Sequence, residues 1–357
     1  MDENENVKKP KKRRKRRRVN VFGRLMAFLG VTLLCVLATA LVFVGIAVKG
    51  PSPTLTGAVC NSLRETSAIR WIPNLYLSEE ELAPYLLQRT EDVETEQVNT
   101  SLIHIAPVQE KTENGGETRP VVELEDIAYG SCRGKLLTIH DPKRVILGIS
   151  GNFGVDPGLQ LTDMVAKYNG VAGTNAGGFV DNNGRGNGGT PTGMVLVENQ
   201  ILYGSVDARY NVIGLDGEGV LIVGTMTGQQ ALDRGMKYGV SFTTHDGIAS
   251  SLIINGEVQS QNLGPGVNPR TAIGQTENGD LLLLVLDGRS SKTLGATLDD
   301  VVDIMKQRGA INAGNLDGGS SSVMVYGGEI INNCASVTGP RGIPTGFIVL
   351  GEEADNG

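Results

Sequence analysis

Four glycine-rich segments hold the side chains of this 357-residue chain that could do chemistry. Each segment places a polar or charged side chain among residues without bulk. Such loops let backbone N–H groups approach a ligand closely and point at an anion. The segments read Asn175-Ala-Gly-Gly-Phe179, Asn268-Pro-Arg-Thr-Ala-Ile-Gly274, Leu286-Asp-Gly-Arg289 and Asn315-Leu-Asp-Gly-Gly-Ser-Ser-Ser322.

The last of these segments is the most informative. The carboxylate of Asp317 could serve as a base or a nucleophile, and Gly318 and Gly319 leave room beside it for a substrate. Ser320 could donate a hydrogen bond from its hydroxyl or its amide. The alternative interpretation is an Asp-Gly turn in which a serine caps the next strand.

Three further places invite a chemical interpretation. Arg270 follows a proline, and its planar guanidinium suits a phosphate or a carboxylate, although this segment by itself favours a surface arginine at a strand entry. His245 and Asp246 could form an acid/base pair or a turn. Oxygen-rich residues at 181–183 could hold Ca²⁺ or Mg²⁺, or form an Asx turn.

Several common sites are excluded or weakly supported. The run GGSSS lacks the closing glycine of a nucleophile elbow, and no GxxxxGK[ST] phosphate loop occurs. The run GRGNGG at 184–189 follows no clear strand and precedes no helix, which argues against a dinucleotide site. The four cysteines form no CxxC pair, and the three histidines are scattered, so we expect no cofactor and no zinc site.

The N-terminal region predicts a membrane anchor. Residues 25–48 carry no charge, and a helix of 24 residues exceeds the ~30 Å hydrocarbon core. A cleaved signal peptide is the alternative, but its apolar region is usually ~7–15 residues long. The basic run at 8–18 should keep the N-terminus cytoplasmic. We therefore expect a single-pass protein of the cell membrane whose remaining residues lie outside.

The charge is unevenly distributed. Residues 1–24 hold 11 Lys/Arg and three Asp/Glu, a net of +8, whereas residues 49–357 hold 21 Lys/Arg and 36 Asp/Glu, a net of −15. The larger part would repel a phosphate backbone, and aromatic residues make up only 4% of the chain. Both observations argue against nucleic acid as a partner.

Periodicity and turn signals predict four regions: a basic tail (1–24), a transmembrane helix (25–48), a helical stalk with a polar linker (49–120) and a catalytic domain (121–357). In the stalk, Ser78 and Glu81 resemble a capping box, and we expect helices that end near Gln88. The domain alternates short β-rich runs with Gly, Asn and Asp turns, which favours an α+β fold with a mixed, largely antiparallel sheet. Two helices should interrupt the strands, at 161–168 with Thr162 as cap and at 297–308. We find no clear internal repeat.

Taken in order, NAGGF, NPRTAIG, LDGR, NLDGGSSS and the closing IPTGFIVL resemble the phosphodiester glycosidase family over residues 125–351. The resemblance implies hydrolysis of sugar-1-phosphodiesters. It implicates Asp317, with Asp287 as the alternative carboxylate, and Arg270 or else Arg289 on the phosphate. The substrate-binding residues that it implies are Asn175, Gly177, Gly178, Phe179, Thr271, Arg289, Gly318, Gly319, Ser320 and Thr345.

An extracellular location would make surface or exported glycans the substrates, in the setting of exopolysaccharide or cell-envelope synthesis. Two alternatives stay open. The protein could bind or assemble glycans without catalysis, or it could be a phosphodiesterase that cuts the P–O bond, which would require a metal.

Overall fold

The computed structural model describes residues 21–64, 69–85, 97–105, 120–181, 186–243, 250–259, 266–334 and 339–351. The chain divides into two compact units, Met1–Ile46 and Ala47–Gly357. Most of the predicted basic tail and polar linker lies outside the described residues, as do Asn182, Asn183, His245 and Asp246.

Helix α1 (Val21–Lys49) contains the predicted span. An 18-residue window within Phe22–Lys49 has a mean hydropathy of 2.8, so the helix is long and apolar enough to cross a membrane. A signal sequence near the N-terminus would meet the same criterion. The helix is therefore a candidate membrane anchor or signal sequence.

Short helices follow at the start of the second unit: α2 (Pro53–Arg64), the 3₁₀ turn η1 (Pro73–Leu75) and α3 (Glu79–Leu82). The predicted capping box is confirmed, because Ser78 accepts from the Glu81 amide and Glu81 accepts from the Ser78 amide. Helix α3 ends at Leu82, and the 3₁₀ turn η2 (Thr100–Leu102) follows it among the described residues. Gln88, where we expected helix to end, lies outside the described residues.

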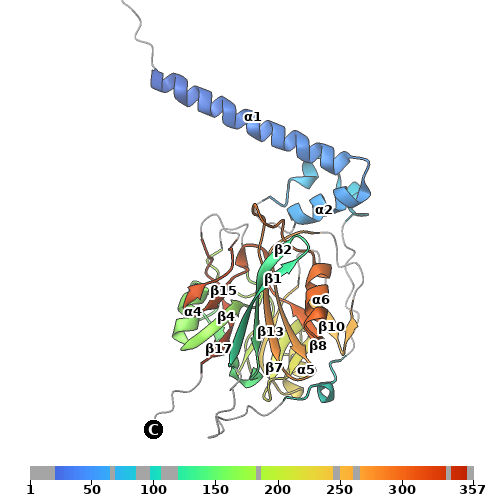
Figure 1. Cartoon of the computed structure of the whole chain (residues 1–357), viewed down its shortest axis with the longest axis vertical. Helices are drawn as coiled ribbons and strands as arrows, with labels where there is room; N and C mark the ends of the chain where they lie inside the picture. The colour runs from blue at the N-terminus through green and yellow to red at the C-terminus, as the bar shows by residue number, and fades with distance from the viewer. Residues whose placement is uncertain are drawn as a thin grey trace, which may run out of the picture. The chain divides into compact units, whose positions relative to one another are not determined.

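The domain beyond residue 120 is built from three sheets, and every strand pair in its described residues is antiparallel, as expected. The first sheet has the order β1 (Val122–Tyr129), β2 (Cys132–Ile139), β13 (Leu281–Leu286), β12 (Arg270–Thr276), β14 (Ala310–Asn315), β10 (Ser251–Ile254), β11 (Glu257–Val258). The second has the order β16 (Glu329–Ile330), β15 (Met324–Tyr326), β4 (Gly170–Asn175), β17 (Thr345–Leu350), β3 (Val145–Ile149). The third has the order β6 (Gln200–Tyr203), β5 (Val195–Val197), β9 (Met236–Ser241), β7 (Arg209–Asp216), β8 (Leu221–Thr227). Figure 1 labels many of these strands.

The three sheets share one central core. It includes Leu283 from the first sheet, Phe347 from the second and Ile213 from the third. The run LLLLVL of β13 is buried throughout because alternate residues enter different cores. Leu283 and Val285 enter the central core, and Leu282 and Leu284 face the core beneath α6.

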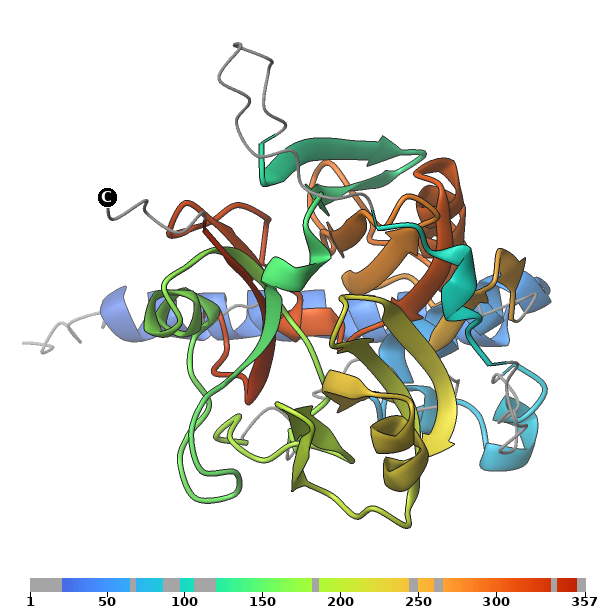
Figure 2. The ribbon, with the colours of Figure 1, turned by 90° about the horizontal axis from the view of Figure 1, so that it is seen from below.

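One helix covers the outer side of each sheet, and Figure 2 shows α4 and α5 outside their sheets. Helix α6 (Leu298–Gln307) confirms the helix predicted at 297–308, and its apolar positions 298, 301, 302 and 305 are buried. Thr297, which we placed inside the helix, is its N-cap. Helix α4 (Leu161–Lys167) is also confirmed, but the predicted Thr162 cap is wrong. The N-cap is Gln160, because the bridge between Leu159 and Ile343 places the helix start earlier.

Helix α5 (Gly228–Asp233) is a third helix that we did not expect. At six residues it is too short to show a helical period in the sequence. Its capping box, in which Thr227 and Gln230 exchange hydrogen bonds, was the available signal.

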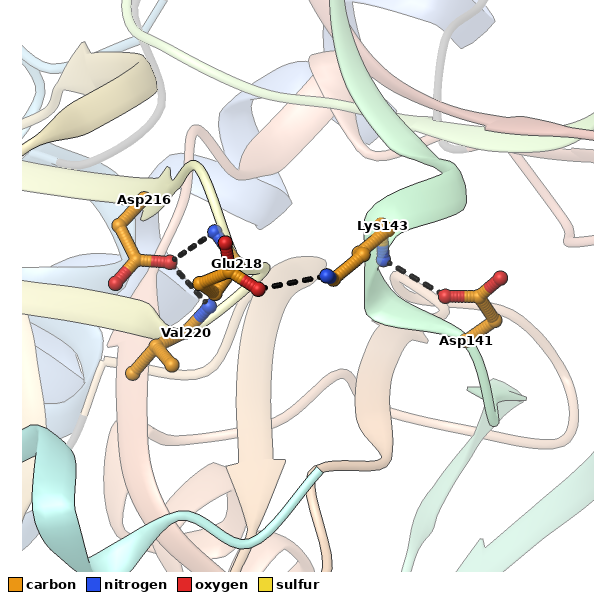
Figure 3. A network of polar contacts seen from close by, with 5 residues as sticks. All are labelled: Asp141, Lys143, Asp216, Glu218 and Val220. Atoms are coloured by element: carbon orange, nitrogen blue, oxygen red, sulfur yellow. Dashed lines mark hydrogen bonds and ion pairs between the residues drawn. The ribbon is translucent and has the colours of Figure 1, made fainter. Parts of the chain in front are cut away.

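A polar network ties the turn at 141–144 to the hairpin between β7 and β8 (Figure 3). Lys143 Nζ lies 2.6 Å from Glu218 Oε2, and Asp216 accepts from the amides of Glu218 and Val220 at 2.9 Å each. Nearby, an ideal Cβ on Gly219 would lie 2.9 Å from Pro142, so the turns pack closely. This contact joins the hairpin of the third sheet to the turn that precedes β3.

Candidate active site

Two helix–strand units deliver the loops of the site. Helix α4 ends at Lys167 and α6 at Gln307, and each is followed two residues later by a positive φ, at Asn169 (51°) and Gly309 (78°). The strands that follow, β4 and β14, are six residues long and end at an asparagine. The two units therefore share a helix–turn–strand pattern, which the sequence does not show as a clear repeat.

The loops after these two strands lie against each other. The Asp317 amide donates to the Ala176 carbonyl at 3.0 Å, and the Leu316 amide donates to the Thr271 carbonyl at 2.8 Å. The structure thus brings the first, second and fourth glycine-rich segments to one place. They come from two different sheets, so their approach depends on the central core between the sheets.

Asn175 holds this junction together. Its Oδ1 accepts from Thr271 Oγ1 at 2.9 Å and from the Val323 amide at 3.1 Å. Its Nδ2 donates to the Asp317 carbonyl at 2.6 Å. Asn175 is 1% exposed and Thr271 is fully buried. Both residues therefore position the loops.

Thr345 adds a further link from β17. Its Oγ1 accepts from the Gly177 amide at 3.1 Å, and its carbonyl accepts from the Ala176 amide at 3.2 Å. This explains the closing motif of the sequence: Thr345 is buried and ties the first motif to the last strand. Five of the predicted residues, Asn175, Gly177, Thr271, Asp317 and Thr345, are thus joined directly or through one neighbour.

The glycines of the site allow close packing of backbone. An ideal Cβ on Gly177 would lie 3.0 Å from Val240 Cβ, and one on Gly178 would lie 2.7 Å from Thr192 Oγ1. An ideal Cβ on Gly318 would lie 2.9 Å from the Pro269 carbonyl oxygen. Position 319 requires glycine for a different reason: its φ is +63°, a conformation that residues with a Cβ rarely adopt.

The carboxyl of Asp317 is partly buried at the centre of this junction. Burial raises its pKa to about 7, against the lowering effects of a Ser321 hydrogen bond, the Arg341 charge and the Gly318 amide. The nearby charge of Asp181 adds to the rise. A carboxyl that titrates near neutral pH can both accept and release a proton under ordinary conditions.

Arg341 and Asp181 complete the surroundings of Asp317. They form an ion pair, with side chains 16% and 21% exposed, and the Arg341 guanidinium lies 4.9 Å from the centroid of the Phe179 ring. Phe179 is itself buried at 9% exposure. Sequence reasoning missed Arg341. Its one available signal was its position just before the closing motif, four residues before Thr345. It considered Asp181 only as a metal ligand.

Of the remaining predicted residues, Arg270 and Arg289 contact the loop at 266–268, whereas Asp287 and Ser320 contact residues 333 and 334. Arg270 is buried and donates to the carbonyls of Ala296 (3.1 Å) and Gly266 (2.7 Å). Arg289 donates to the Val267 carbonyl at 2.7 Å. Asp287 accepts from the Asn333 amide at 2.9 Å, and burial raises its pKa. Ser320 lies in the turn after Gly319, where its carbonyl faces the Cys334 thiol at 3.9 Å.

The structure therefore places the two candidate carboxylates among different neighbours. The pKa of Asp317 responds to Arg341 and Asp181, and that of Asp287 responds to Asn333 and Lys135. Across the described residues, no group of three His, Cys, Asp or Glu side chains could hold a metal ion, and the four cysteines are free thiols. The calcium or magnesium site that we considered at 181–183 stays a prediction, since two of its residues lie outside the described ranges.

The sequence pattern of phosphodiester glycosidases matches residues 168–350, just over half of the chain. The chain belongs to the phosphodiester glycosidase family. The matched range includes both carboxylates, Arg341 and Asp181.

Two curated proteins are similar to parts of this member of the family. The SPbeta prophage-derived uncharacterized protein YomE of Bacillus subtilis (strain 168) is 44% identical over 66 residues, which are 18% of this chain and 10% of that protein. The N-acetylglucosamine-1-phosphodiester alpha-N-acetylglucosaminidase of Mus musculus is 26% identical over 152 residues, 39% of this chain and 29% of that protein. The chain thus matches less than a third of the length of either relative.

A solved structure shares the fold. The catalytic domain of the zebrafish N-acetylglucosamine-1-phosphodiester alpha-N-acetylglucosaminidase, auto-inhibited by its pro-peptide, superposes with a TM-score of 0.53 at 20% identity. The superposition covers 74% of this chain and 97% of that chain. At this identity the likeness shows the fold alone.

Proposed function

We propose that this protein hydrolyses sugar-1-phosphodiesters, with Asp317 as the base or nucleophile. The observation that carries the proposal is the environment of Asp317: a partly buried carboxyl with a pKa of about 7, between Ser321 and Arg341, at the meeting point of three family motifs. Membership of the family supports the substrate class.

The reaction breaks the bond between the anomeric carbon and the phosphate oxygen. In one version, ionised Asp317 takes a proton from water, whose oxygen attacks the anomeric carbon as the phosphomonoester leaves with the bonding electrons. In the other, the carboxylate attacks first and water then hydrolyses the glycosyl ester. A phosphomonoester is already a stable anion, so this leaving group depends less on a strong general acid than an alkoxide does.

The neighbouring residues position that carboxylate. Asn175 holds the main chain of Asp317 at 2.6 Å, and Ser321 donates a hydrogen bond to the carboxylate. These contacts keep the reacting oxygens in place while part of their hydration is removed, which lowers the reorganisation that the reaction requires. Asp287 is the alternative carboxylate, and its separate neighbours make the two roles distinguishable by mutation.

We further propose that α1 is an uncleaved anchor with a cytoplasmic N-terminus and an extracellular catalytic domain. The helix is apolar over Phe22–Lys49, and the basic residues precede it. The substrates would then be surface or exported glycans of the exopolysaccharide or cell-envelope type. In intact cells, external protease should digest a C-terminal tag and spare an N-terminal tag on the same full-length chain, whereas loss of the N-terminal tag by maturation would indicate a signal peptide.

The activity test uses the full chain in detergent, with α-N-acetylglucosamine-1-phosphodiesters and a panel of other sugar-1-phosphodiesters, with and without EDTA. Free sugar plus an intact phosphomonoester, lost in Asp317→Asn and retained in Asp207→Asn at an exposed aspartate, would support the proposal. Sugar-1-phosphate as the product would indicate P–O cleavage and contradict it. Glycan binding without turnover of any diester would favour a binding protein.

A further inference from the structure

The substrate class creates an electrostatic difficulty at this site. A sugar-1-phosphodiester is an anion, and it must approach Asp317 with Asp181 nearby, on a domain whose residues 49–357 carry a net charge of −15. Like charges at short range oppose binding unless a cation lies between them. A local cation is therefore required, and the family motif suggested Arg270 or Arg289.

Those two arginines are already engaged elsewhere. Arg270 spans two main-chain carbonyls, of Ala296 and Gly266, and Arg289 donates to the Val267 carbonyl and to Asn268 Oδ1. The arginine whose charge acts on Asp317 is Arg341. We infer that Arg341 binds the substrate phosphate, and that Asp181 occupies this position in the resting protein and is displaced by the phosphate. The inference rests on the proposed function.

The guanidinium of Arg341 is prepared for that role. It is 16% exposed, it stacks 4.9 Å from the centroid of the Phe179 ring, and it pairs with Asp181. A guanidinium has five N–H donors, and one carboxylate engages at most two of them in a fork. Stacking restricts the rotation of the group, so binding a phosphate costs little side-chain entropy.

The backbone beneath Arg341 is also held firmly. An ideal Cβ on Gly342 would lie 2.6 Å from the Gly158 carbonyl oxygen, and one on Gly188 would lie 2.0 Å from the Gly342 carbonyl oxygen. Ile343 pairs with Leu159 through two hydrogen bonds of 2.8 and 3.1 Å. Three chain segments thus meet without side chains between them and fix the start of the Arg341 side chain.

The arrangement predicts selectivity for charged substrates. Removing Arg341 costs a charge-assisted interaction with the phosphate, and an uncharged aryl glycoside lacks that interaction. The two members of the ion pair also act oppositely on Asp317, because Arg341 lowers its pKa and Asp181 raises it. A merely structural ion pair would not predict the selectivity, and the opposite shifts test whether both charges act on Asp317.

The experiment compares Arg341→Met, Arg341→Lys and Asp181→Asn with wild type, as full chains in detergent. The substrates are an α-N-acetylglucosamine-1-phosphodiester and p-nitrophenyl α-N-acetylglucosaminide, and phenyl phosphate is the inhibitor. For Arg341→Met we expect kcat/KM to fall about 10- to 100-fold more on the diester than on the aryl glycoside, and the Ki of phenyl phosphate to rise at least about tenfold. Arg341→Lys should recover part of both losses.

The pH profile on the diester gives an independent readout. Its acid limb should move to higher pH in Arg341→Met and to lower pH in Asp181→Asn. Arg308→Met, which also breaks an arginine–carboxylate pair but lies outside the site, should match wild type. Equal losses on both substrates with an unchanged Ki, or limbs that move in the same direction, would overturn the inference. A wild type that hydrolyses no diester would instead refute the proposed function. The Kd of phenyl phosphate, measured by calorimetry without turnover, would then test the inference, and a Kd unchanged in Arg341→Met would refute it.

Discussion

Replacing Asp317 with asparagine should strongly reduce turnover and stabilise the protein in a pH-dependent way. Burial raises the pKa of this carboxyl from an ordinary 3.8 to about 7, so the folded protein holds the proton more tightly than the unfolded chain. Between these two values the folded state binds more protons, and its stability therefore falls as the pH rises. Above pH 7 the loss is complete and stays constant.

The size of the effect follows from the two pKa values. Each unit of difference is worth about 1.36 kcal/mol, so the ionisable carboxyl costs about 2 kcal/mol at pH 5 and about 4 kcal/mol at pH 8. Because the carboxyl is only partly buried, solvent screening reduces these values. We expect the stability advantage of Asp317→Asn to be about 1–3 kcal/mol larger at pH 8 than at pH 5.

The assay is denaturant unfolding of the full chain in detergent at several pH values. Asp207→Asn, at an exposed aspartate, controls for the general effect of removing a carboxylate. Turnover of the diester should fall about 10²–10⁴-fold in Asp317→Asn, and the wild-type rate should rise with pH through about 7 as the carboxylate forms. A difference in stability between Asp317→Asn and wild type that does not change with pH would refute the reasoning.

Three further predictions concern the frame of the site. Asn175→Ala should lower the free energy of unfolding by about 2–4 kcal/mol, because the three hydrogen bonds of the Asn175 side chain are lost. Thr271→Val, which removes one of these bonds, should lower it by about 1 kcal/mol. Equal losses of the two variants in denaturant unfolding would contradict the central role of Asn175. Thr297→Ala should lower the free energy of unfolding by about 1 kcal/mol, because α6 loses its N-cap, and should leave turnover unchanged. Impaired turnover would argue that Thr297 does more than cap α6. Gly188→Ala should lower both the thermal midpoint and diester turnover, because its φ is +73° and an ideal Cβ lies 2.0 Å from a backbone oxygen. Gly217→Ala, where the space is open, should stay close to wild type in both measurements.

Local signals in the sequence were sufficient to predict several elements. Helix α6 carries its apolar face and its stop at Gly309 within a short stretch, and both were predicted, whereas the cap at Thr297 was counted as the first residue of the helix. The Ser78 capping box is equally local. The α+β class followed from turn spacing, and the family followed from motifs in a fixed order. In each case the residues that interact are close in the sequence.

The charged group around Asp317 was beyond such reasoning. Asp181 and Arg341 are 160 positions apart, and no local pattern indicates that they pair. The roles of the glycines were also hidden, because Gly178 packs against Thr192 and Gly318 against Pro269, contacts that only the assembled sheets create. The sequence could identify which residues matter, but their partners come from different sheets.

The repeated helix–strand unit escaped notice for a related reason. Aligned from their helix ends, the segments at 168–179 and 308–319 share only Asn175 with Asn315 and Gly178 with Gly318. What the two copies have in common is backbone conformation: a helix end, a positive φ, six strand residues and a loop. Many side chains satisfy those requirements, so the two segments share a backbone pattern although their sequences have little in common.

The two copies also explain why only one of them carries the proposed chemistry. In this alignment Gly177 takes the place of Asp317, and an ideal Cβ there would already lie 3.0 Å from Val240, so a side chain at this position would be tightly packed. The first copy therefore holds the backbone of the second in place. Asn175 Nδ2 donates to the Asp317 carbonyl at 2.6 Å, and the Asp317 amide donates to the Ala176 carbonyl at 3.0 Å. The second copy can hold a carboxyl in a partly buried place, where its ionised form is destabilised, because the first fixes its backbone. The central core that the three sheets share offsets the loss of folding stability that this partly buried carboxyl causes.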